Sequence, residues 1–370
     1  MKIGFVGGGT GGHFYPLIAV VERLNAEADG IELYYFGPAP YDQDLLKVHG
    51  VKFVYCPAGK LRLYFSIQNI LDIFRNFFGI FVAIVKLYNI YPDVIFSKGG
   101  YTSVPILIAA RLLRIPVVIH ESDAVPGRAN LLARSFARYI AISYEATVQY
   151  FPKEKTALTG IPIRRSVLTA DPDPFTTLGV PHDLPLLYVT GGSSGAEKIN
   201  NILICSLDSL LPYYRIYHQT GTLDKNEMAL AAKALITDPV LQSRYYIADL
   251  IDARTVNALL SAASLVITRA GSTTIFEIAL HGKPSIIIPI PEDVSRDQRT
   301  NAYTYARTGA ATVIEEKNLT ESLLTHEIHT IIGNPETAAK MGQAALAFAP
   351  RDAAEQIANI LRQIGIEHGS

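Results

Sequence analysis

Short apolar runs alternate with longer amphipathic stretches along most of the chain. The runs are rich in β-branched and aromatic residues, which is typical of strands. They predict strands at residues 2–6, 32–36, 94–97, 116–120, 139–142, 186–190, 215–218, 265–268, 285–288 and 312–314. The stretches between them predict helices. Because strands separated by helices pair in parallel through βαβ units, we expect an α/β protein.

A proline-rich segment, "TGIPIRRSVLTADPDP" at residues 159–174, ends the first series of βα units. A new glycine-rich turn, "VTGGSSGAEKIN", follows a strand soon afterwards. We therefore predict two Rossmann-like, doubly wound domains, with the cleft between them as the default ligand site. The pattern alone leaves open on which domain the final helix, residues 352–364, packs.

Net charge, cysteine spacing and the lengths of the apolar runs exclude several classes of function. The 370 residues carry a net charge of −1, which offers no general attraction to nucleic acid, so no such partner is expected. The two cysteines have no metal-ligand spacing, and we predict no metal site. We find neither a signal-peptide pattern nor an uninterrupted membrane-spanning run, and we expect a cytoplasmic protein.

The turn "GGGTGGHFYP" at residues 7–16 matches a dinucleotide fingerprint through Gly7, Gly9 and Gly12. The next predicted strand, however, ends in "FGP" without the carboxylate that binds a ribose, which disfavours a dinucleotide. His13 follows the turn at a helix start, where amide groups and the helix dipole disfavour a protonated imidazole. A neutral histidine is suited to act as a general base. The alternatives are a tight turn without a ligand and a histidine that caps its own helix.

Gly-Gly turns follow predicted strands at three places, residues 7–9, 99–100 and 191–192, and each precedes a predicted helix. Backbone amides at a helix start bind phosphate readily. Three such turns in one chain indicate substrates rich in phosphate.

Eight motifs in order carry a resemblance to a known family: "GGTGGHFYP", "SKGGYTSVP", "HESDAVPGRAN", "TGIPIR", "GGSSGA", "YHQTG", "RAGSTTIFE" and "DQRTNA". Together they resemble the MurG family of peptidoglycan glycosyltransferases. The resemblance implies a GT-B fold and transfer of N-acetylglucosamine from UDP-N-acetylglucosamine to the muramyl 4-hydroxyl of lipid I, giving lipid II. No cofactor is implied. It also implies that the final helix returns to the first domain, so we predict domains at residues 1–163 plus 349–370 and at 164–348.

The resemblance implies a set of donor-binding residues. Glu277 would bind the ribose hydroxyls, although its spacing from Thr274 also fits a helix-capping box. Ser193 and Arg164 would contact the diphosphate, the Ile251 backbone the uracil, and Gln298 the sugar. The full donor set is Thr10, Gly11, Gly12, Asp123, Arg164, Ser193, Ile251, Ser272, Thr273, Thr274, Glu277 and Gln298. We interpret His218 of "YHQTG" as structural support.

Acceptor binding and chemistry follow from the same resemblance. Gly9, Gly99, Gly100 and Tyr101 would bind the acceptor's diphosphate, with charge added by Lys98. Many family members carry Asn where Asp123 stands, and that Asn contacts the donor sugar. As a carboxylate, Asp123 could accept hydrogen bonds from sugar hydroxyls or rival His13 as the proton acceptor. The expected reaction inverts the anomeric centre. We expect it to need no metal, because Arg164, Ser193 and a helix end could stabilise the departing UDP in place of a divalent cation.

Residues 60–93 have an unusual composition, with clustered phenylalanines and few acidic residues. We predict an exposed apolar patch edged by positive charge that rests on an anionic inner membrane leaflet. Its residues are Phe74, Arg75, Phe77, Phe78 and Phe81. The alternative is an internal helix pair. The protein would then be peripheral on the cytoplasmic face of the cell membrane.

Three other functions remain open. The nearest is a transferase of the same build that glycosylates diacylglycerol or another lipid. A UDP-N-acetylglucosamine 2-epimerase would share the fold but need no membrane patch. A non-catalytic nucleotide-binding module would leave His13 and the acceptor-side glycine turns without a purpose.

Overall fold

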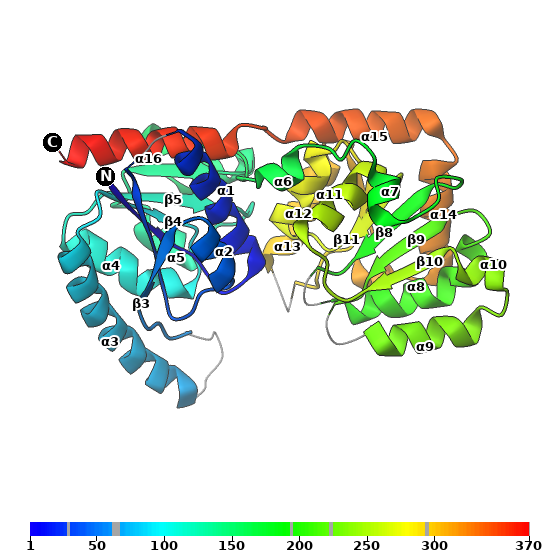
Figure 1. Cartoon of the computed structure of the whole chain (residues 1–370), viewed down its shortest axis with the longest axis horizontal. Coiled ribbons are helices and arrows are strands. Elements are labelled where there is room, and N and C mark those ends of the chain that lie inside the picture. The colour runs from blue at the N-terminus through cyan, green and yellow to red at the C-terminus, as the bar shows by residue number, and fades with distance from the viewer. Residues whose placement is uncertain (28–29, 61–66, 193–194, 222–224, 293–295, 370) are drawn as a thin grey trace. The chain divides into compact units, whose positions relative to one another are not determined.

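The computed structural model describes residues 1–27, 30–60, 67–192, 195–221, 225–292 and 296–369. The chain forms two compact units, Met1–Arg164 with Asp352–Ser370 (unit 1) and Arg165–Arg351 (unit 2) (Figure 1). Arg164, which the sequence prediction assigned to the second domain, thus belongs to unit 1. Residues 349–351 belong to unit 2, where Arg351 donates a 2.7 Å hydrogen bond to the Leu280 carbonyl.

Unit 1 is built on a seven-stranded parallel sheet in the order β3-β2-β1-β4-β5-β6-β7. The strands are β1 Lys2–Val6, β2 Glu32–Gly37, β3 Val51–Tyr55, β4 Val94–Ser97, β5 Val117–Glu121, β6 Tyr139–Ile142 and β7 Thr156–Leu158. The α-helices are α1 Gly11–Glu27, α2 Gln43–Val48, α3 Ile67–Ile90, α4 Val104–Leu112, α5 Arg128–Ala133 and α16 Ala353–Gly369. Short 3-10 turns are η1 Tyr101–Ser103, η2 Glu145–Tyr150 and η3 Lys153–Lys155.

Unit 2 repeats this plan with a six-stranded parallel sheet in the order β10-β9-β8-β11-β12-β13. The strands are β8 Leu186–Thr190, β9 Arg215–Gln219, β10 Tyr245–Ala248, β11 Leu265–Thr268, β12 Ser285–Ile287 and β13 Ala311–Val313. The helices are α6 Arg165–Leu168, α7 Pro174–Leu178, α8 Glu197–Leu210, α9 Lys225–Leu235, α10 Pro239–Gln242, α11 Ala253–Ala262, α12 Ser272–Leu280, α13 Arg296–Ala306, α14 Glu321–Ile332 and α15 Pro335–Phe348, with η4 at Glu316–Asn318.

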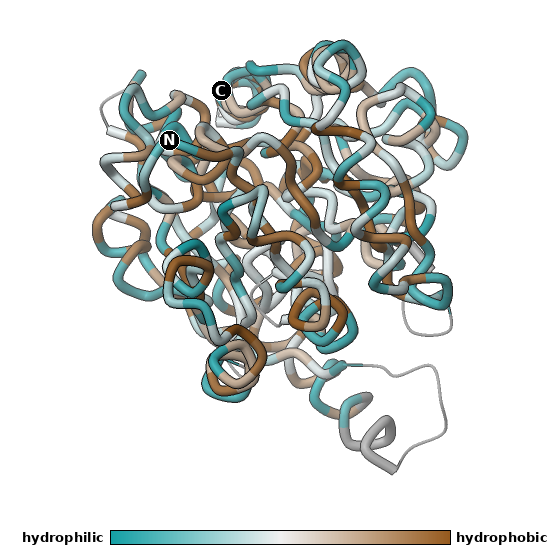
Figure 2. The backbone as a smooth tube through the Cα atoms, turned by 90° about the vertical axis from the view of Figure 1, so that its right-hand side faces the viewer, coloured by the Kyte–Doolittle hydropathy of each residue, from teal (hydrophilic) through white to brown (hydrophobic). Residues whose placement is uncertain are grey.

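Central strands of both sheets are buried on both faces, which explains their continuous apolar runs. The helices cover the sheets with one face, and Figure 2 shows hydrophobic and hydrophilic residues alternating around their turns. The last helix, α16, follows this rule in unit 1. Its Ile357 and Leu361 join the core that contains Ile3 of β1, and Glu355 pairs with Arg23 of α1.

The structure contains all ten predicted strands, with ends that differ by one residue at several places. It adds three strands that the apolar pattern did not predict: β3, β7 and β10. All three lie at sheet edges. Edge strands bury less of their surface, so residues such as Lys52 and Tyr55 of β3 stay exposed and the hydrophobic signal is weak.

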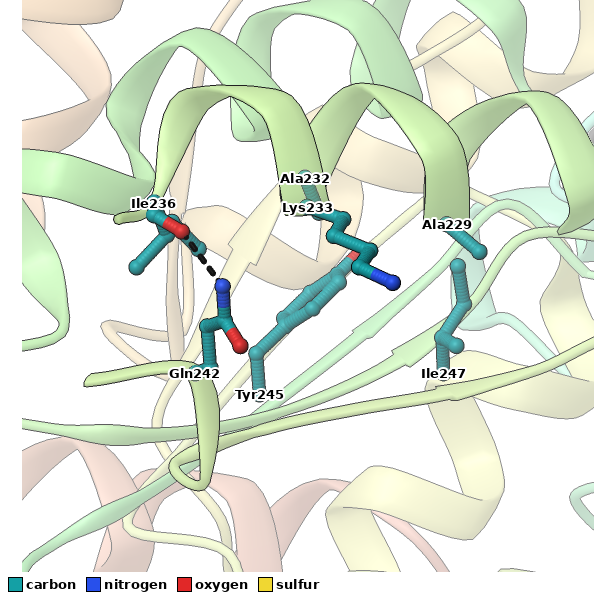
Figure 3. A pocket seen from close by; sticks show the side chains of 7 residues that line it. All are labelled: Ala229, Ala232, Lys233, Ile236, Gln242, Tyr245 and Ile247. Carbon is teal, nitrogen blue, oxygen red and sulfur yellow. Dashed lines mark hydrogen bonds between the residues drawn. The ribbon is translucent and has the colours of Figure 1, made fainter. Parts of the chain in front are cut away.

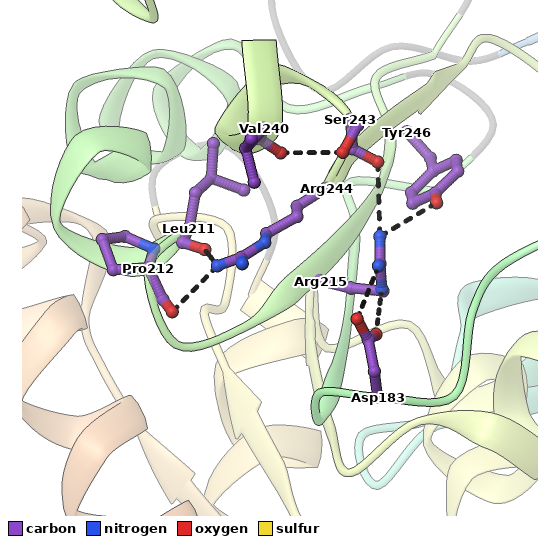
Figure 4. A network of polar contacts seen from close by, with 8 residues as sticks. All are labelled: Asp183, Leu211, Pro212, Arg215, Val240, Ser243, Arg244 and Tyr246. Atoms are coloured by element: carbon purple, nitrogen blue, oxygen red, sulfur yellow. Dashed lines mark hydrogen bonds and ion pairs between the residues drawn. The ribbon is translucent and has the colours of Figure 1, made fainter. Parts of the chain in front are cut away.

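Polar residues at the amino-terminal ends of the unit 2 strands form a purely structural network (Figure 4). The guanidinium of Arg215, at the start of β9, binds Asp183 through two nitrogens at 2.6 and 2.9 Å. The Arg244 side chain donates to the carbonyls of Leu211 and Pro212, both at 2.9 Å. Such bonds hold the loops that lead into neighbouring strands. In open α/β sheets ligands bind at the opposite, carboxyl ends of the strands.

Candidate functional site

Two glycine turns meet at the carboxyl ends of β1 and β4, the neighbouring strands where the strand order of unit 1 reverses. Gly100 has a positive φ of 81°, and a Cβ there would lie 3.0 Å from the Cα of Gly8. Only glycine permits this backbone conformation and this close approach. The structure thus brings the predicted Gly9, Gly99 and Gly100 to one place. Tyr101 follows, with an exposed side chain.

His13 is the third residue of α1 and lies against this pair of turns. Its Nδ1 is 2.9 Å from the Thr10 hydroxyl, so Nε2 is the ring nitrogen left for a substrate. Nε2 lies 3.8 Å from the position that a Gly100 Cβ would take. The third and fourth amides of the helix, those of His13 and Phe14, donate to the Thr10 carbonyl and not to the imidazole.

The imidazole of His13 is neutral, as the sequence predicts, but the main cause differs from the predicted helix dipole. Burial lowers the pKa of His13 to about 4, and the positive charge of Lys98 acts in the same direction. The negative charge of Asp123 acts in the opposite direction and raises the pKa of His13. A base that is neutral over the whole physiological range can accept a proton from a hydroxyl group.

Acidic groups follow β5 in the same neighbourhood. The carboxylate of Glu121 accepts hydrogen bonds from the amides of Asp123 and Gly127 at 3.0 and 2.9 Å. The side-chain amide of Asn130 donates a third, at 2.9 Å. Burial and the nearby Asp123 charge raise the pKa of Glu121 above its usual range. Asp123 itself is half-buried, beside the predicted base.

The guanidinium of Arg164 stacks on the Tyr15 ring of α1, 3.9 Å from the ring centroid. This cation–π contact fixes the side chain near the same end of α1 that carries His13. The structure therefore explains how Arg164 is oriented. Its contact with a nucleotide diphosphate stays a prediction.

Unit 2 has a corresponding glycine turn after β8, next to β11, where its strand order reverses. A Cβ on Gly191 would lie 2.4 Å from the Ala196 amide nitrogen, so the turn needs glycine. Ser193, predicted to bind the diphosphate, lies outside the described residues. Gly192 is described, and a side chain there would point into open space.

Helix α12 begins beside this turn, after β11. Gly271 is its N-cap, so Ser272, Thr273 and Thr274 form its first turn. The alternative of a capping box is wrong, because Thr274 lies inside the helix rather than at its N-cap. Glu277 follows one turn later, half-buried, and its charge acts on Tyr188 of β8. Asn301 supports the preceding turn through a 3.4 Å bond to the Ala270 carbonyl.

Two further donor candidates lie on other loops of unit 2. Gln298 is in α13, and its side-chain oxygen accepts a 3.4 Å bond from the Ile290 amide after β12. Ile251 lies between β10 and α11 and is half-buried. The loops after β8, β10, β11 and β12 all leave the carboxyl ends of parallel strands, so they share one edge of the sheet.

His218 is structural, as the sequence interpretation states. The ring is fully buried between the Tyr245 hydroxyl, 2.7 Å from Nδ1, and the Asn200 side-chain oxygen, 3.0 Å from Nε2. Burial lowers the pKa of His218 to about 3. With both nitrogens bonded inside the protein, the ring serves the packing of unit 2.

Comparison with known proteins decides the family. The sequence matches the glycosyltransferase family 28 N-terminal domain over residues 3–142 and the C-terminal domain over residues 186–357. The chain belongs to glycosyltransferase family 28.

Two family 28 relatives carry the same printed name, UDP-N-acetylglucosamine--N-acetylmuramyl-(pentapeptide) pyrophosphoryl-undecaprenol N-acetylglucosamine transferase. The protein from Shouchella clausii is 38% identical over 345 residues, covering 91% of this chain and 92% of its own length. The form numbered 2 from Bacillus cereus is 36% identical over 338 residues, covering 90% and 92%.

Solved structures agree on the fold. The MurG of Acinetobacter baumannii gives a TM-score of 0.73 at 24% identity, covering 98% of this chain and 99% of that one. A UDP-GlcNAc 2-epimerase from Neisseria meningitidis, solved with UDP-GlcNAc, gives 0.68 at 14% identity, covering 98% and 100%. These likenesses place the two parallel-sheet units in the GT-B class that the sequence predicts.

Three buried polar residues of this family 28 chain were missed or misread by sequence reasoning. Glu121 and Asn130 were not singled out, although a charged residue directly after an apolar strand is a usable signal. Lys98 was expected to add charge at the turn surface. Instead its side chain turns inward, is 2% exposed, and binds His120 and Ser122.

Helix α3 presents the predicted aromatic residues on one exposed stripe. The exposed fractions of Phe74, Phe77, Phe78 and Phe81 are 68, 70, 61 and 64%. The opposite face, with Ala83 and Leu87, packs in the core that contains Ile106 and Leu107 of α4. Helix α3 is thus half of an internal pair and also carries a free apolar stripe. Arg75 pairs with Asp72 at 3.3 Å, which offsets part of its charge.

One cavity of about 200 Å³ lies elsewhere in unit 2, between α9 and β10 (Figure 3). Ala232, Ile236 and Ile247 line much of it. The Gln242 amide is bonded to the Ile236 carbonyl at 2.6 Å, and the Tyr245 hydroxyl to His218. Apart from Lys233, the polar side chains that line the cavity are bonded within the protein, and we do not treat it as a candidate substrate site.

The residues that the structure describes contain no cluster of His, Cys, Asp and Glu that could hold a metal ion. Among them no helix has both the length and the hydropathy that crossing a bilayer demands.

Proposed function

We propose that this chain is an inverting N-acetylglucosaminyltransferase that moves N-acetylglucosamine from UDP-N-acetylglucosamine to the muramyl 4-hydroxyl of lipid I, giving lipid II. The names of relatives 36–38% identical over about nine-tenths of the chain support this substrate pair. The observation that carries the proposal is the neutral His13 imidazole beside two phosphate-compatible glycine turns. A nucleotide-binding module alone has no use for such a base.

Unit 1 binds the acceptor in this proposal. The amides of Gly9, Gly99 and Gly100 receive the lipid carrier's diphosphate, because open backbone turns at helix starts suit phosphate oxygens. The acceptor hydroxyl then lies against Nε2 of His13. The proposal requires the tautomer in which Nδ1–H donates to the Thr10 hydroxyl, 2.9 Å away, so that Nε2 carries the lone pair that takes the proton.

Unit 2 binds the donor. Glu277 accepts hydrogen bonds from both ribose hydroxyls, a task for which a carboxylate has enough acceptor sites. Ser272, Thr273 and the first amides of α12 receive the diphosphate of UDP, where the positive end of the helix dipole stabilises negative charge. Gln298 holds sugar hydroxyls, and the backbone at Ile251 contacts the uracil.

The proposed reaction uses the acceptor bound to unit 1 and the donor bound to unit 2. The acceptor oxygen displaces UDP from the anomeric carbon in one step, so the configuration inverts. The proton passes to His13, and the charge that develops on UDP is met by α12, Ser193 and Arg164. Turnover is expected to survive chelation of divalent cations.

A transfer assay tests the function. Radiolabelled UDP-N-acetylglucosamine and its galacto epimer are each offered with a lipid I analogue, with diacylglycerol, and with no acceptor. The proposal expects a product only from the gluco donor and lipid I, with or without EDTA. Transfer to diacylglycerol would support the other lipid acceptor, and epimerisation without an acceptor would support the epimerase.

The exposed stripe on α3 supports a location for the protein at a membrane surface. A lipid-linked acceptor lies in a membrane, and the stripe offers four phenylalanines with Lys86 exposed nearby. We place the protein peripherally on the cytoplasmic face, with α3 in the anionic leaflet surface. Each phenylalanine that enters the lipid contributes roughly 1.5–3 kcal/mol.

Liposome flotation tests this location. The wild-type chain should float with anionic vesicles, and a Phe77→Ser, Phe81→Ser variant should stay at the bottom. The matched control is Leu230→Ser, which removes an exposed apolar side chain from α9 of unit 2. Equal flotation of the wild type and the double variant contradicts the assignment.

A further inference from the structure

A buried ammonium group lies beneath the two glycine turns of unit 1. Lys98 directly follows β4, and its Nζ is 2.7 Å from Nδ1 of His120 and is hydrogen-bonded to the Ser122 hydroxyl. A buried lysine is costly unless its donors are satisfied and its charge is compensated. These bonds tie the end of β4 to the end of β5.

The tautomer of His120 is set by its other ring nitrogen. Nε2 lies 2.8 Å from the Gly160 carbonyl, which can only accept, so Nε2 carries the hydrogen. Nδ1 is therefore a lone-pair acceptor for the ammonium of Lys98. Burial, together with the Lys98 charge, holds the pKa of His120 well below its ordinary value. The pair thus consists of a neutral imidazole and a cationic lysine.

The compensating charges come from β5 and the loop that follows it. Burial lowers the pKa of Lys98, while Glu121 and Asp123 raise it. Glu121 in turn is held by the amides of Asp123 and Gly127 and by Asn130. Lys98 and His13 also lie on either side of Gly7, where an added Cβ would be 3.4 Å from the Lys98 Cβ and 3.2 Å from the His13 carbonyl oxygen. The charged or titratable groups around Lys98 are therefore the carboxyls of Glu121 and Asp123 and the rings of His120 and His13.

We propose that Lys98 is a positioning residue whose buried ammonium helps to keep the imidazole of His13 unprotonated when an anion binds at the glycine turns, and fixes the loop that carries Asp123. The inference rests on the proposed function, because it assigns His13 the role of base. It gives Lys98 an effect on the base, whereas the sequence prediction was only that Lys98 adds charge at the acceptor's diphosphate.

The need for such a cation follows from the proposed acceptor. A diphosphate at the glycine turns brings negative charge close to His13, which favours the protonated imidazole. A protonated His13 cannot accept the hydroxyl proton. A fixed positive charge on the protein side offsets the substrate's charge, so the base stays neutral while the anion is bound.

Histidine NMR on the full-length chain tests the charge effect directly. The His13 signal is assigned by its loss in a His13→Gln variant, and its titration is followed in wild type, Lys98→Met, Lys98→Gln and Lys98→Arg. Lys98→Met and Lys98→Gln should move the titration midpoint upward by about one pH unit. Lys98→Arg should leave it in place, as should the control Lys153→Met, which removes an exposed lysine of η3.

The glutamine variant separates charge from hydrogen bonding. It keeps an N–H donor for His120 but carries no charge, so a midpoint at the wild-type value in folded Lys98→Gln overturns the proposal. It also serves as the second neutral variant if Lys98→Met does not fold.

Kinetics distinguish this inference from the proposed function. In the transfer assay, kcat/KM is measured as a function of pH. In both neutral variants its acidic limb should move to higher pH together with the NMR midpoint. A moved midpoint in a chain without transferase activity contradicts the proposed function and leaves the charge effect standing. Full activity with an unmoved acidic limb and midpoint overturns the role of Lys98 alone.

Discussion

The two units use one architecture but place different chemistry at the same position in it. Each has a glycine turn after its first strand, where the strand order reverses. In unit 1 that turn is surrounded by ionisable groups: His13, Lys98, Glu121 and Asp123. In unit 2 the first turn of α12 offers hydroxyls, with the carboxylate of Glu277 one turn further on.

Buried histidines make the contrast sharper. His120 of unit 1 accepts from a charged lysine, whereas His218 of unit 2 has the neutral partners Tyr245 and Asn200. A cluster with charged members can shift the pKa of a group that transfers a proton, whereas a neutral cluster only fixes the positions of its side chains. The difference agrees with the proposed function, in which unit 1 supplies the base and unit 2 binds the nucleotide.

The largest effect is expected from His13→Ala. Loss of a general base should lower kcat by ~10²–10⁴, measured by transfer to the lipid I analogue. The control His326→Ala removes an exposed histidine from α14 of unit 2. A near-normal kcat in His13→Ala, with a large loss in Asp123→Asn, would transfer the role of base to Asp123.

Glu277→Gln tests the binding role of unit 2. Loss of hydrogen bonds to a charged group costs about 1.5–3 kcal/mol, so KM for UDP-N-acetylglucosamine should rise about 10- to 100-fold while kcat changes little. The control Glu321→Gln changes an exposed carboxylate at the start of α14. A fall in kcat at constant KM would remove Glu277 from ribose binding.

His218 predicts a pH dependence of stability. Its pKa is about 3 when folded and 6.5 when unfolded, so the unfolded chain binds the proton first. Its contribution is complete above pH 6.5 and is lost as the pH falls towards 3, by about 1.4 kcal/mol per pH unit.

Urea unfolding of His218→Gln measures this contribution. The variant should be less stable than wild type near neutral pH, with the difference shrinking as the pH falls. Asn359→Asp, on α16 of unit 1, serves as a control that leaves this histidine in place. A constant difference at all pH values would contradict the neutral, buried state of His218.

The smallest effect concerns α3, whose exposed phenylalanines have no counterpart on α11, the helix between β10 and β11 of unit 2. Lys86→Gln should weaken binding to anionic vesicles about fivefold, since one basic residue near the surface is worth about 1 kcal/mol. Binding to neutral vesicles should not change, and neither should that of Lys153→Gln to anionic ones. Equal losses on both vesicle types would mean that Lys86 acts through folding rather than through charge.

Much of this arrangement could be predicted from local patterns. Nine of the ten predicted strands lie inside the sheets, where burial gives a continuous apolar run, and the tenth, β13, lies at an edge. The other three edge strands, β3, β7 and β10, were not predicted. The glycine turns and His13 could be found because a βα turn is a local feature. The inward direction of Lys98 could not, since it depends on His120 and Ser122 of another strand and loop.

The sequence by itself determined the α/β class, the glycine turns and the residue types beside them, because each depends on neighbours within one or two turns of chain. Only the tertiary structure decided that Gly8 and Gly100 touch, that Thr274 is not a helix cap, and that Lys98 is buried under the predicted base. The physical reason is that parallel pairing brings strand ends together from distant parts of the chain. Burial and charge at those ends, which set the protonation state of His13, exist only once the sheet has formed.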